Sequence, residues 1–122
     1  MYFPVSGWFM AFVLTVAIEA PIVWLLVKRA EPDLPRLGVL ILFADLATHP
    51  AVWFIVPQLL LVGTLSYTLV AETWATTAEA VFYGAAIKGL SPRRAIAVAV
   101  AANVTSFLVG RAISELWPEL FW

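Results

Sequence analysis

Apolar residues fill four long stretches of the chain, and short polar segments that contain proline or glycine separate these stretches. The pattern predicts four helices, at about 6–27, 36–54 or a little beyond, 67–87 and 92–114. Each stretch has about 20 residues, the length that a helix needs to cross the hydrocarbon core of a bilayer. We therefore expect an all-α fold, a four-helix transmembrane bundle that forms a single domain over residues 1–122.

Proline and glycine also indicate where the predicted helices meet. Ser91 and Pro92 form a clear helix start, because serine caps the first turn and proline fits its first position. Between the second and third helices, Pro57, Gly63 and Ser66 mark the expected turn.

Positive charges are concentrated in the two segments that follow the first and third predicted helices. Six of the seven Lys and Arg residues lie there: Lys28, Arg29, Arg36, Lys88, Arg93 and Arg94. In a four-helix bundle the segments 28–36 and 88–94 face the same side of the membrane, and an excess of Lys and Arg marks the cytoplasmic side. We therefore expect a protein of the bacterial inner membrane with both termini outside.

The composition supports a membrane protein and excludes several kinds of site. Of the 122 residues, 63% are apolar and 12% are charged, whereas about a quarter of the residues of a soluble domain are charged. The chain has no cysteine, which excludes disulfides, iron–sulfur clusters and cysteine nucleophiles. With a net charge of −1, nothing points to nucleic acid, and the expected partners are the lipid bilayer and other protein chains.

Four polar residues interrupt the predicted helices at a common depth. Glu19 and Glu79 each lie nine residues before the lysine that ends their helix. Asp45 and Asn103 each lie nine residues after an arginine at the start of theirs. Nine helical residues span about 13.5 Å, and the hydrocarbon core of a bilayer is about 30 Å thick. The four side chains should therefore form one layer near the middle of the membrane.

The same spacings occur twice, which predicts an internal repeat. A hydroxyl residue follows Asp45 and its counterpart by three positions in each half, as Thr48 and Ser106. We expect two tandem helical hairpins, at about 6–57 and 67–115, related by a pseudo-twofold axis along the membrane normal.

The polar layer is typical of a cation site, because ionisable residues within a membrane are functional candidates. Carboxylates with one imidazole suit manganese, iron or zinc, so the expected metal ligands are Glu19, Asp45, His49 and Glu79. Asn103 would be a neutral ligand. A further group would support the site or form a pathway to it: Thr15, Thr48, Glu72, Thr76, Tyr83 and Ser106. The predicted function is binding of a cation, a divalent metal or a proton, by a small transporter or channel that forms a homo-oligomer.

Other interpretations stay open. Protonated acids could hold the bundle together, although hydrogen bonds between membrane helices contribute only about 0.6 kcal/mol on average. The chain could be an accessory subunit of a larger respiratory or photosynthetic complex, with polar stripes that face a partner. His49 could bind a haem or a chlorophyll-type pigment, but a haem within one chain usually needs a second axial ligand, and the sequence has no second histidine.

The sequence favours a protein that is not an enzyme. It contains no H-E-x-x-H metalloprotease motif, no G-x-S-x-G nucleophile elbow and no glycine-rich phosphate loop. A lipid-modifying activity that uses the carboxylates stays open.

Overall fold

The computed structural model describes residues 5–121, which are helical except for short connections and contain no strand. The segments in chain order are α1 (Val5–Val27), α2 (Leu34–Pro50), a π-helix (Ala51–Ile55), α3 (Val56–Leu59), α4 (Leu65–Ala86), α5 (Pro92–Leu116) and a 3-10 helix (Pro118–Leu120). Residues 34–59 are helical without a break, so the second predicted helix forms one rod made of α2, the π-helix and α3.

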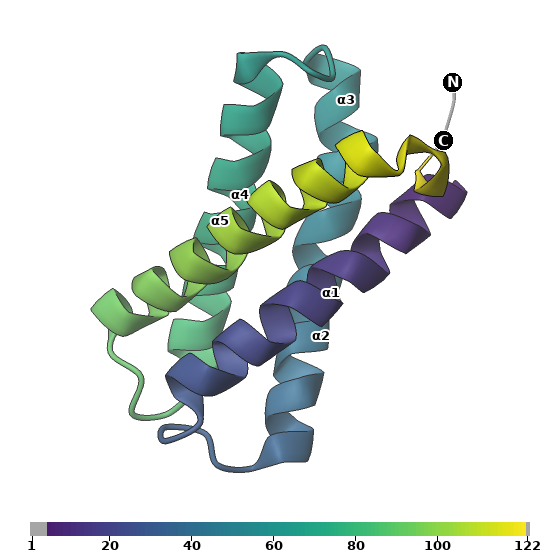
Figure 1. Cartoon of the computed structure of the whole chain (residues 1–122). Helices are drawn as coiled ribbons and strands as arrows, with labels where there is room; N and C mark the ends of the chain where they lie inside the picture. Colours follow the sequence, from purple (N-terminus) through teal and green to yellow (C-terminus); the bar gives the residue numbers. More distant parts are fainter. Residues whose placement is uncertain (1–4, 122) are drawn as a thin grey trace.

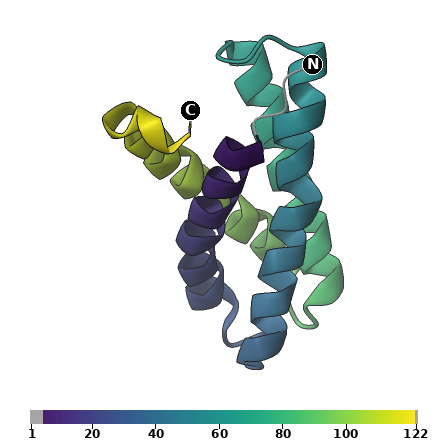
Figure 2. The same cartoon turned by 90° about the vertical axis from the view of Figure 1, so that its right-hand side faces the viewer.

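The four long helical segments form a bundle in which each lies against two others (Figures 1 and 2). α1 packs against α2 and α5, and α4 packs against α2 and α5. The α1–α2 and α4–α5 connections lie together at one end of the bundle, which we call the loop end. The α3–α4 turn, the start of α1 and the C-terminal helix lie at the opposite end, which we call the turn end.

The turn between the second and third helices is shorter than the sequence predicted. Pro57 lies inside α3 and Ser66 inside α4, so only residues 60–64 are outside helices. Pro57 is the second residue of α3, which continues directly from the π-helix. Gly63 adopts a left-handed φ of 86°, and the Thr64 hydroxyl then caps α4 by accepting a hydrogen bond from the Tyr67 amide at 3.3 Å.

A change of helix type follows Pro50, the last residue of α2. The next five residues wind as a π-helix, because proline supplies no amide donor to the regular ladder. The Tyr67 hydroxyl of α4 donates a hydrogen bond to the Val52 carbonyl at 3.0 Å. A neighbouring helix thus satisfies part of the irregular backbone, as is required where such a backbone lies away from water.

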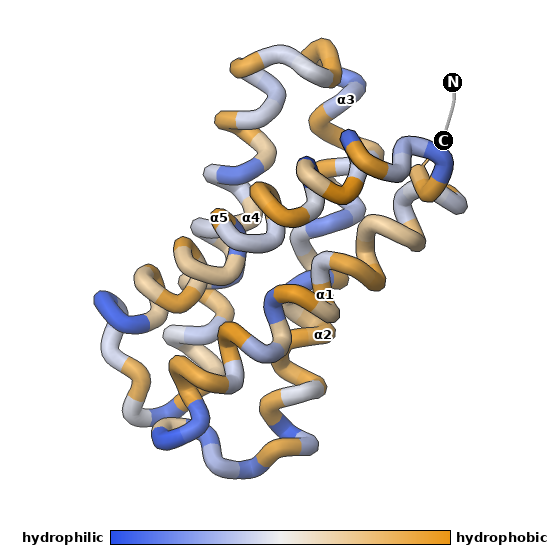
Figure 3. Tube along the Cα trace, viewed as in Figure 1, coloured by the Kyte–Doolittle hydropathy of each residue, from blue (hydrophilic) through white to orange (hydrophobic). Residues whose placement is uncertain are grey.

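Three helices are long and apolar enough to cross a membrane: Val5–Val27, Leu34–Leu59 and Pro92–Leu116. The outer faces of these helices expose large apolar side chains, whereas hydrophilic residues gather at the loop end (Figure 3). α4 has a comparable length of 22 residues, but it carries Glu72, Glu79 and several threonines and is less apolar.

Apolar side chains fill the half of the bundle next to the loop end. This group, which we call the apolar seal, consists of Val23, Val27, Leu37, Ile41, Ala44, Tyr83, Ile87, Leu90, Ala95, Val98 and Ala102. On every helix these residues lie between the predicted polar layer and the loop end. Many of them are alanine or valine, which lets helix backbones approach closely.

Two arginines join the helix ends at the loop end. Arg36 of α2 donates from Nη2 to the carbonyl of Ala86 at the end of α4, at 2.9 Å. Arg94 of α5 donates from Nη2 to the carbonyl of Leu26 at the end of α1, at 3.1 Å. A cation at the C-terminal carbonyls of a helix is favourable, because those carbonyls carry partial negative charge.

Gly7 allows α1 to approach the C-terminal segment. A Cβ at this position would meet the backbone carbonyl of Phe121, so Gly7→Ala is expected to destabilise the protein by about 1–3 kcal/mol, the usual cost of overpacking. Gly84→Ala is the matched control, because its Cβ would make an ordinary contact with Ala95 at 3.5 Å and alanine favours a helix. Thermal unfolding in detergent measures both variants, and equal midpoints would contradict the prediction.

Candidate cation site

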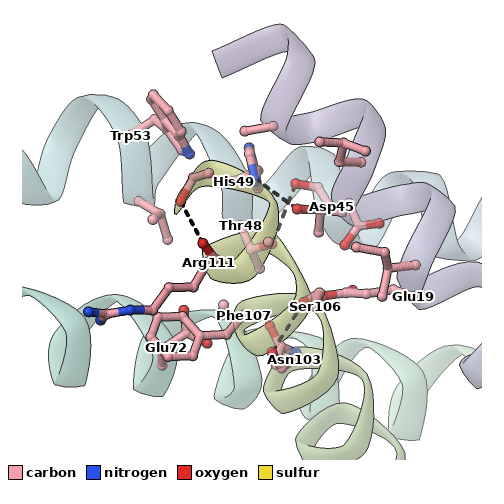
Figure 4. A pocket seen from close by; sticks show the side chains of 18 of the residues that line it. Glu19, Asp45, Thr48, His49, Trp53, Glu72, Asn103, Ser106, Phe107 and Arg111 are labelled. Carbon is pink, nitrogen blue, oxygen red and sulfur yellow. Dashed lines mark hydrogen bonds between the residues drawn. The ribbon is translucent and has the colours of Figure 1, made fainter. Parts of the chain in front are cut away.

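Three carboxyl side chains meet at the centre of the bundle. Glu19 of α1, Asp45 of α2 and Glu79 of α4 are each only 1% exposed, and one oxygen from each lies within 4.8 Å of the others. We call this group the acid triad. Figure 4 shows Glu19 and Asp45 of the triad beside Thr48, Asn103 and Ser106.

The helices turn these acids inward because each acid occupies a position of a buried apolar stripe. Glu19 precedes the buried Val23 by four residues on α1, and Asp45 follows the buried Ile41 by four residues on α2. Residues four apart lie on the same face of a helix. Glu79 has the same relation to Tyr83. Packing of the apolar seal therefore determines the direction of the carboxyl groups.

Neutral donors satisfy part of the triad. The Ser106 hydroxyl donates to Glu19 at 2.6 Å. The Thr48 hydroxyl lies 3.3 Å from Glu79 and shares its one hydrogen between this carboxylate and the Ala44 carbonyl at 3.1 Å. Asn103 donates from Nδ2 to Glu79. The same Nδ2 lies 2.9 Å from the Ala99 carbonyl, which can only accept, so the amide nitrogen rather than the amide oxygen must face these partners.

The remaining triad oxygens have no donor. Both oxygens of Asp45 and Oε2 of Glu19 are buried without a hydrogen-bond partner, and within residues 5–121 the ion pairs are Arg36–Glu31 and Arg111–Glu115, neither of which involves the triad. Two unit negative charges 4.8 Å apart repel by about 3.5 kcal/mol at an effective dielectric constant of about 20. The triad therefore needs protons or a cation between its oxygens.

A cavity of about 520 Å³ leads to the triad from the turn end. The triad, Thr48, Asn103 and Ser106 lie at its floor, above the apolar seal. Its walls and its opening include Thr15, Trp53, Gly63, Tyr67, Glu72, Phe107, Arg111 and Glu115. Gly63 belongs to the α3–α4 turn, and Arg111 and Glu115 are exposed, so the cavity reaches the surface at that end.

Comparison with known proteins gave no match. No family model, no curated protein and no solved structure matches the chain. The function has to be inferred from the site itself.

His49 does not join the group of carboxylates. Its Nε2 lies 3.3 Å from the Thr15 hydroxyl, and its ring packs between Phe12, with ring centroids 5.7 Å apart, and Trp53, at 6.2 Å. Its Nδ1 is buried without a hydrogen-bond partner. His49 therefore belongs to the cavity wall one turn above Asp45, and the three carboxyl groups alone form the geometric ligand set.

The other predicted site residues divide between the cavity and the packed interior. Thr15 and Glu72 line the cavity, whereas Thr76 does not. Tyr83 is fully buried in the apolar seal.

The sequence interpretation missed several residues that line the cavity. Trp53 lies four residues after His49, a helical spacing that is visible in the sequence, but it was not among the predicted site residues. Tyr67, Phe107 and Arg111 also line the cavity. Their role depends on how the helices pack, and no local pattern indicates it.

Proposed function

We propose that this chain is an integral membrane protein that binds a cation at the acid triad and exchanges it with the side to which the cavity opens. The observation that carries this proposal is the set of buried carboxylate oxygens without donors at the floor of the cavity. Buried charges in proteins are paired or coordinate a cation. No cationic side chain is paired with the triad among residues 5–121.

The proposed membrane arrangement uses all four long helical segments. α1, the α2–α3 rod and α5 have the required length and hydropathy, and α4 would cross with them because its Glu79 is buried and its Glu72 is partly buried against the other helices. Because an excess of basic residues is typical of the cytoplasmic side of a membrane, the loop end would lie in the cytoplasm. The cavity would then open to the outside.

A transporter fits this arrangement better than an accessory subunit does. A subunit that holds a partner through its polar residues would present them on its outer surface, whereas the triad, Thr48 and Asn103 are buried inside the bundle. In transporters built from repeats, cation sites lie near the middle of the membrane where the repeats meet. The cavity gives access to the triad from one side, and movement of the apolar seal would give access from the other.

The ligand chemistry favours a hard divalent cation. Three carboxylates offer up to six oxygens, which suits manganese, magnesium or calcium. Iron and zinc would gain from an imidazole ligand, and His49 lies outside the ligand set. Protons compete with any of these ions, because the ligands must be deprotonated to bind a metal.

Equilibrium dialysis of the detergent-purified chain against Mn²⁺, Mg²⁺, Ca²⁺ and Zn²⁺, with elemental analysis, tests the proposal. We expect about one tightly bound divalent ion per chain. Binding should release at least one proton, so that affinity falls about tenfold for each unit by which the pH is lowered, over the range in which the ion-free triad is protonated. Absence of any stoichiometric ion between pH 6 and pH 9 would contradict the proposal.

A further inference from the structure

The polar contacts of the triad occur in matching pairs. Thr48 of the first helical hairpin donates to Glu79 of the second, and Ser106 of the second donates to Glu19 of the first. The two glutamates are 60 residues apart and the two hydroxyl residues are 58 apart. Each hydroxyl group therefore crosses to the glutamate of the other hairpin in an equivalent way.

The same correspondence holds at the loop end. Arg36 and Arg94 are 58 residues apart, and the carbonyls that they reach, at Ala86 and Leu26, are 60 residues apart. Again each arginine crosses to the other hairpin. The apolar seal separates these two arginine contacts from the triad. The pair of arginine contacts and the pair of hydroxyl contacts are therefore independent observations.

Buried positions in the two hairpins are related by the same differences in residue number, 58 between α2 and α5 and 60 between α1 and α4. Ile41, Ala44 and Asp45 are buried on α2, and the residues 58 positions later on α5 are also buried: Ala99, Ala102 and Asn103. Val27 and Ile87 are buried at the ends of α1 and α4 in the same way. Side chains of different size thus occupy equivalent places in the two hairpins.

The one chemical difference in the polar layer is the pair Asp45 and Asn103. Asn103 donates from its amide to Glu79. Asp45 has an oxygen within 4.8 Å of oxygens of both Glu19 and Glu79, but no hydrogen bond joins it to either glutamate, and an ionised carboxylate has no hydrogen to donate. A carboxamide has nearly the shape of a carboxylate without its charge, so the pair changes the charge of the site while preserving its geometry.

We infer that the cation binds on a pseudo-twofold axis between Glu19 and Glu79, and that positions 45 and 103 are two copies of one ligand position whose occupants determine the charge of the site. This inference rests on the proposed cation site. It predicts that the third carboxylate can be moved from position 45 to position 103 with retention of binding, because both positions face the axis from equivalent places on α2 and α5.

The test is Mn²⁺ binding by the full-length chain in detergent, measured by equilibrium dialysis for the parent, Asp45→Asn and the exchange variant Asp45→Asn/Asn103→Asp. We expect Asp45→Asn to bind at least about 100-fold more weakly and the exchange variant to bind within about tenfold of the parent. Glu119→Gln, in the exposed C-terminal segment, is the control for loss of one acid. An exchange variant that keeps the parent's circular dichroism and thermal midpoint but binds as weakly as Asp45→Asn overturns the inference while the cation site stands. Absence of binding by the parent overturns both.

A second pair of variants keeps the inference testable if the exchange variant does not fold. Thr48→Val and Ser106→Ala each remove the hydroxyl donor of one glutamate. Loss of such a supporting hydrogen bond typically weakens metal binding about 10- to 100-fold, and equivalent positions should give losses within about threefold of one another. A large loss for one variant with none for the other overturns the twofold arrangement.

Discussion

Asp45→Asn is expected to weaken cation binding by at least about 100-fold and at the same time to make the protein more stable. Asp45 carries the carboxylate whose two oxygens are both buried without a donor, and it lies beside both glutamates of the triad. The asparagine would remove one of three mutually repelling charges and supply an amide donor to them. A buried polar group left unsatisfied costs about 1–3 kcal/mol, so the free energy of unfolding should rise by about that amount.

The two effects have opposite directions, and this separates a binding site from a structural one. If the acids only hold the helices together, Asp45→Asn should leave stability unchanged or lower it. Thermal unfolding of the parent and the variant without added metal, followed by the same experiment with excess Mn²⁺, measures both effects. We expect Mn²⁺ to raise the midpoint of the parent and not that of the variant, because a ligand stabilises only the state that binds it. A less stable variant that still responds to Mn²⁺ would refute the expectation.

Arg36→Gln/Arg94→Gln is expected to open the loop end of the bundle. The two arginines carry the hydrogen bonds that join each hairpin to the helix end of the other at that end. Hydrogen bonds to charged groups contribute about 1.5–3 kcal/mol each, and solvent weakens exposed charged contacts such as these, so about 1.4 kcal/mol is expected for the pair. That corresponds to a tenfold change in the equilibrium between sealed and open forms.

The absence of cysteine from the chain makes this change measurable. Ala44→Cys places a single thiol in the apolar seal, at a side chain that is 1% exposed. In membrane vesicles, a membrane-impermeant maleimide applied at the side that the loop end faces, which is the cytoplasmic side in the proposed arrangement, should label this thiol about ten times faster in the double arginine variant than in the parent. Arg93→Gln is the control, because Arg93 is a neighbouring arginine that makes neither contact. Equal labelling rates in all three proteins would show that the arginines do not hold the seal.

The sequence alone indicated the polar layer because depth along a helix depends only on residue count. Glu19, Asp45 and Glu79 are equally far from basic residues at the loop end, and the structure brings their oxygens within 4.8 Å. Depth is a local property, so a sequence carries it. Whether the acids face inward or toward a partner stayed open in the sequence, and the structure shows that each acid faces the same way as the buried apolar residue four positions away.

The direction of the His49 ring could not be predicted from the sequence. Its spacing from Asp45 places the two residues on one face of α2, but the ring turns toward Phe12 and Thr15 of α1 instead of the triad. Packing against another helix decides that direction. The sequence also did not define the limits of the turn between the second and third helices. Proline is common both after the end of a helix and in its first turn, so Pro57 alone does not show where the helix ends. The cavity itself arises only from the way the four long segments diverge at the turn end.

In the proposed membrane arrangement, with the loop end in the cytoplasm, the position of the apolar seal has an electrical consequence. Water that fills the cavity from outside would carry little of the membrane potential, so nearly all of the voltage would fall across the seal. Occupation of the acid triad from outside would then depend only weakly on voltage. Passage through the seal toward a negative cytoplasm would gain about 2.3 kcal/mol per elementary charge at 100 mV, and twice that for a divalent ion. For a cation that moved inward along the proposed route, the membrane voltage would therefore act on its release and hardly on its capture.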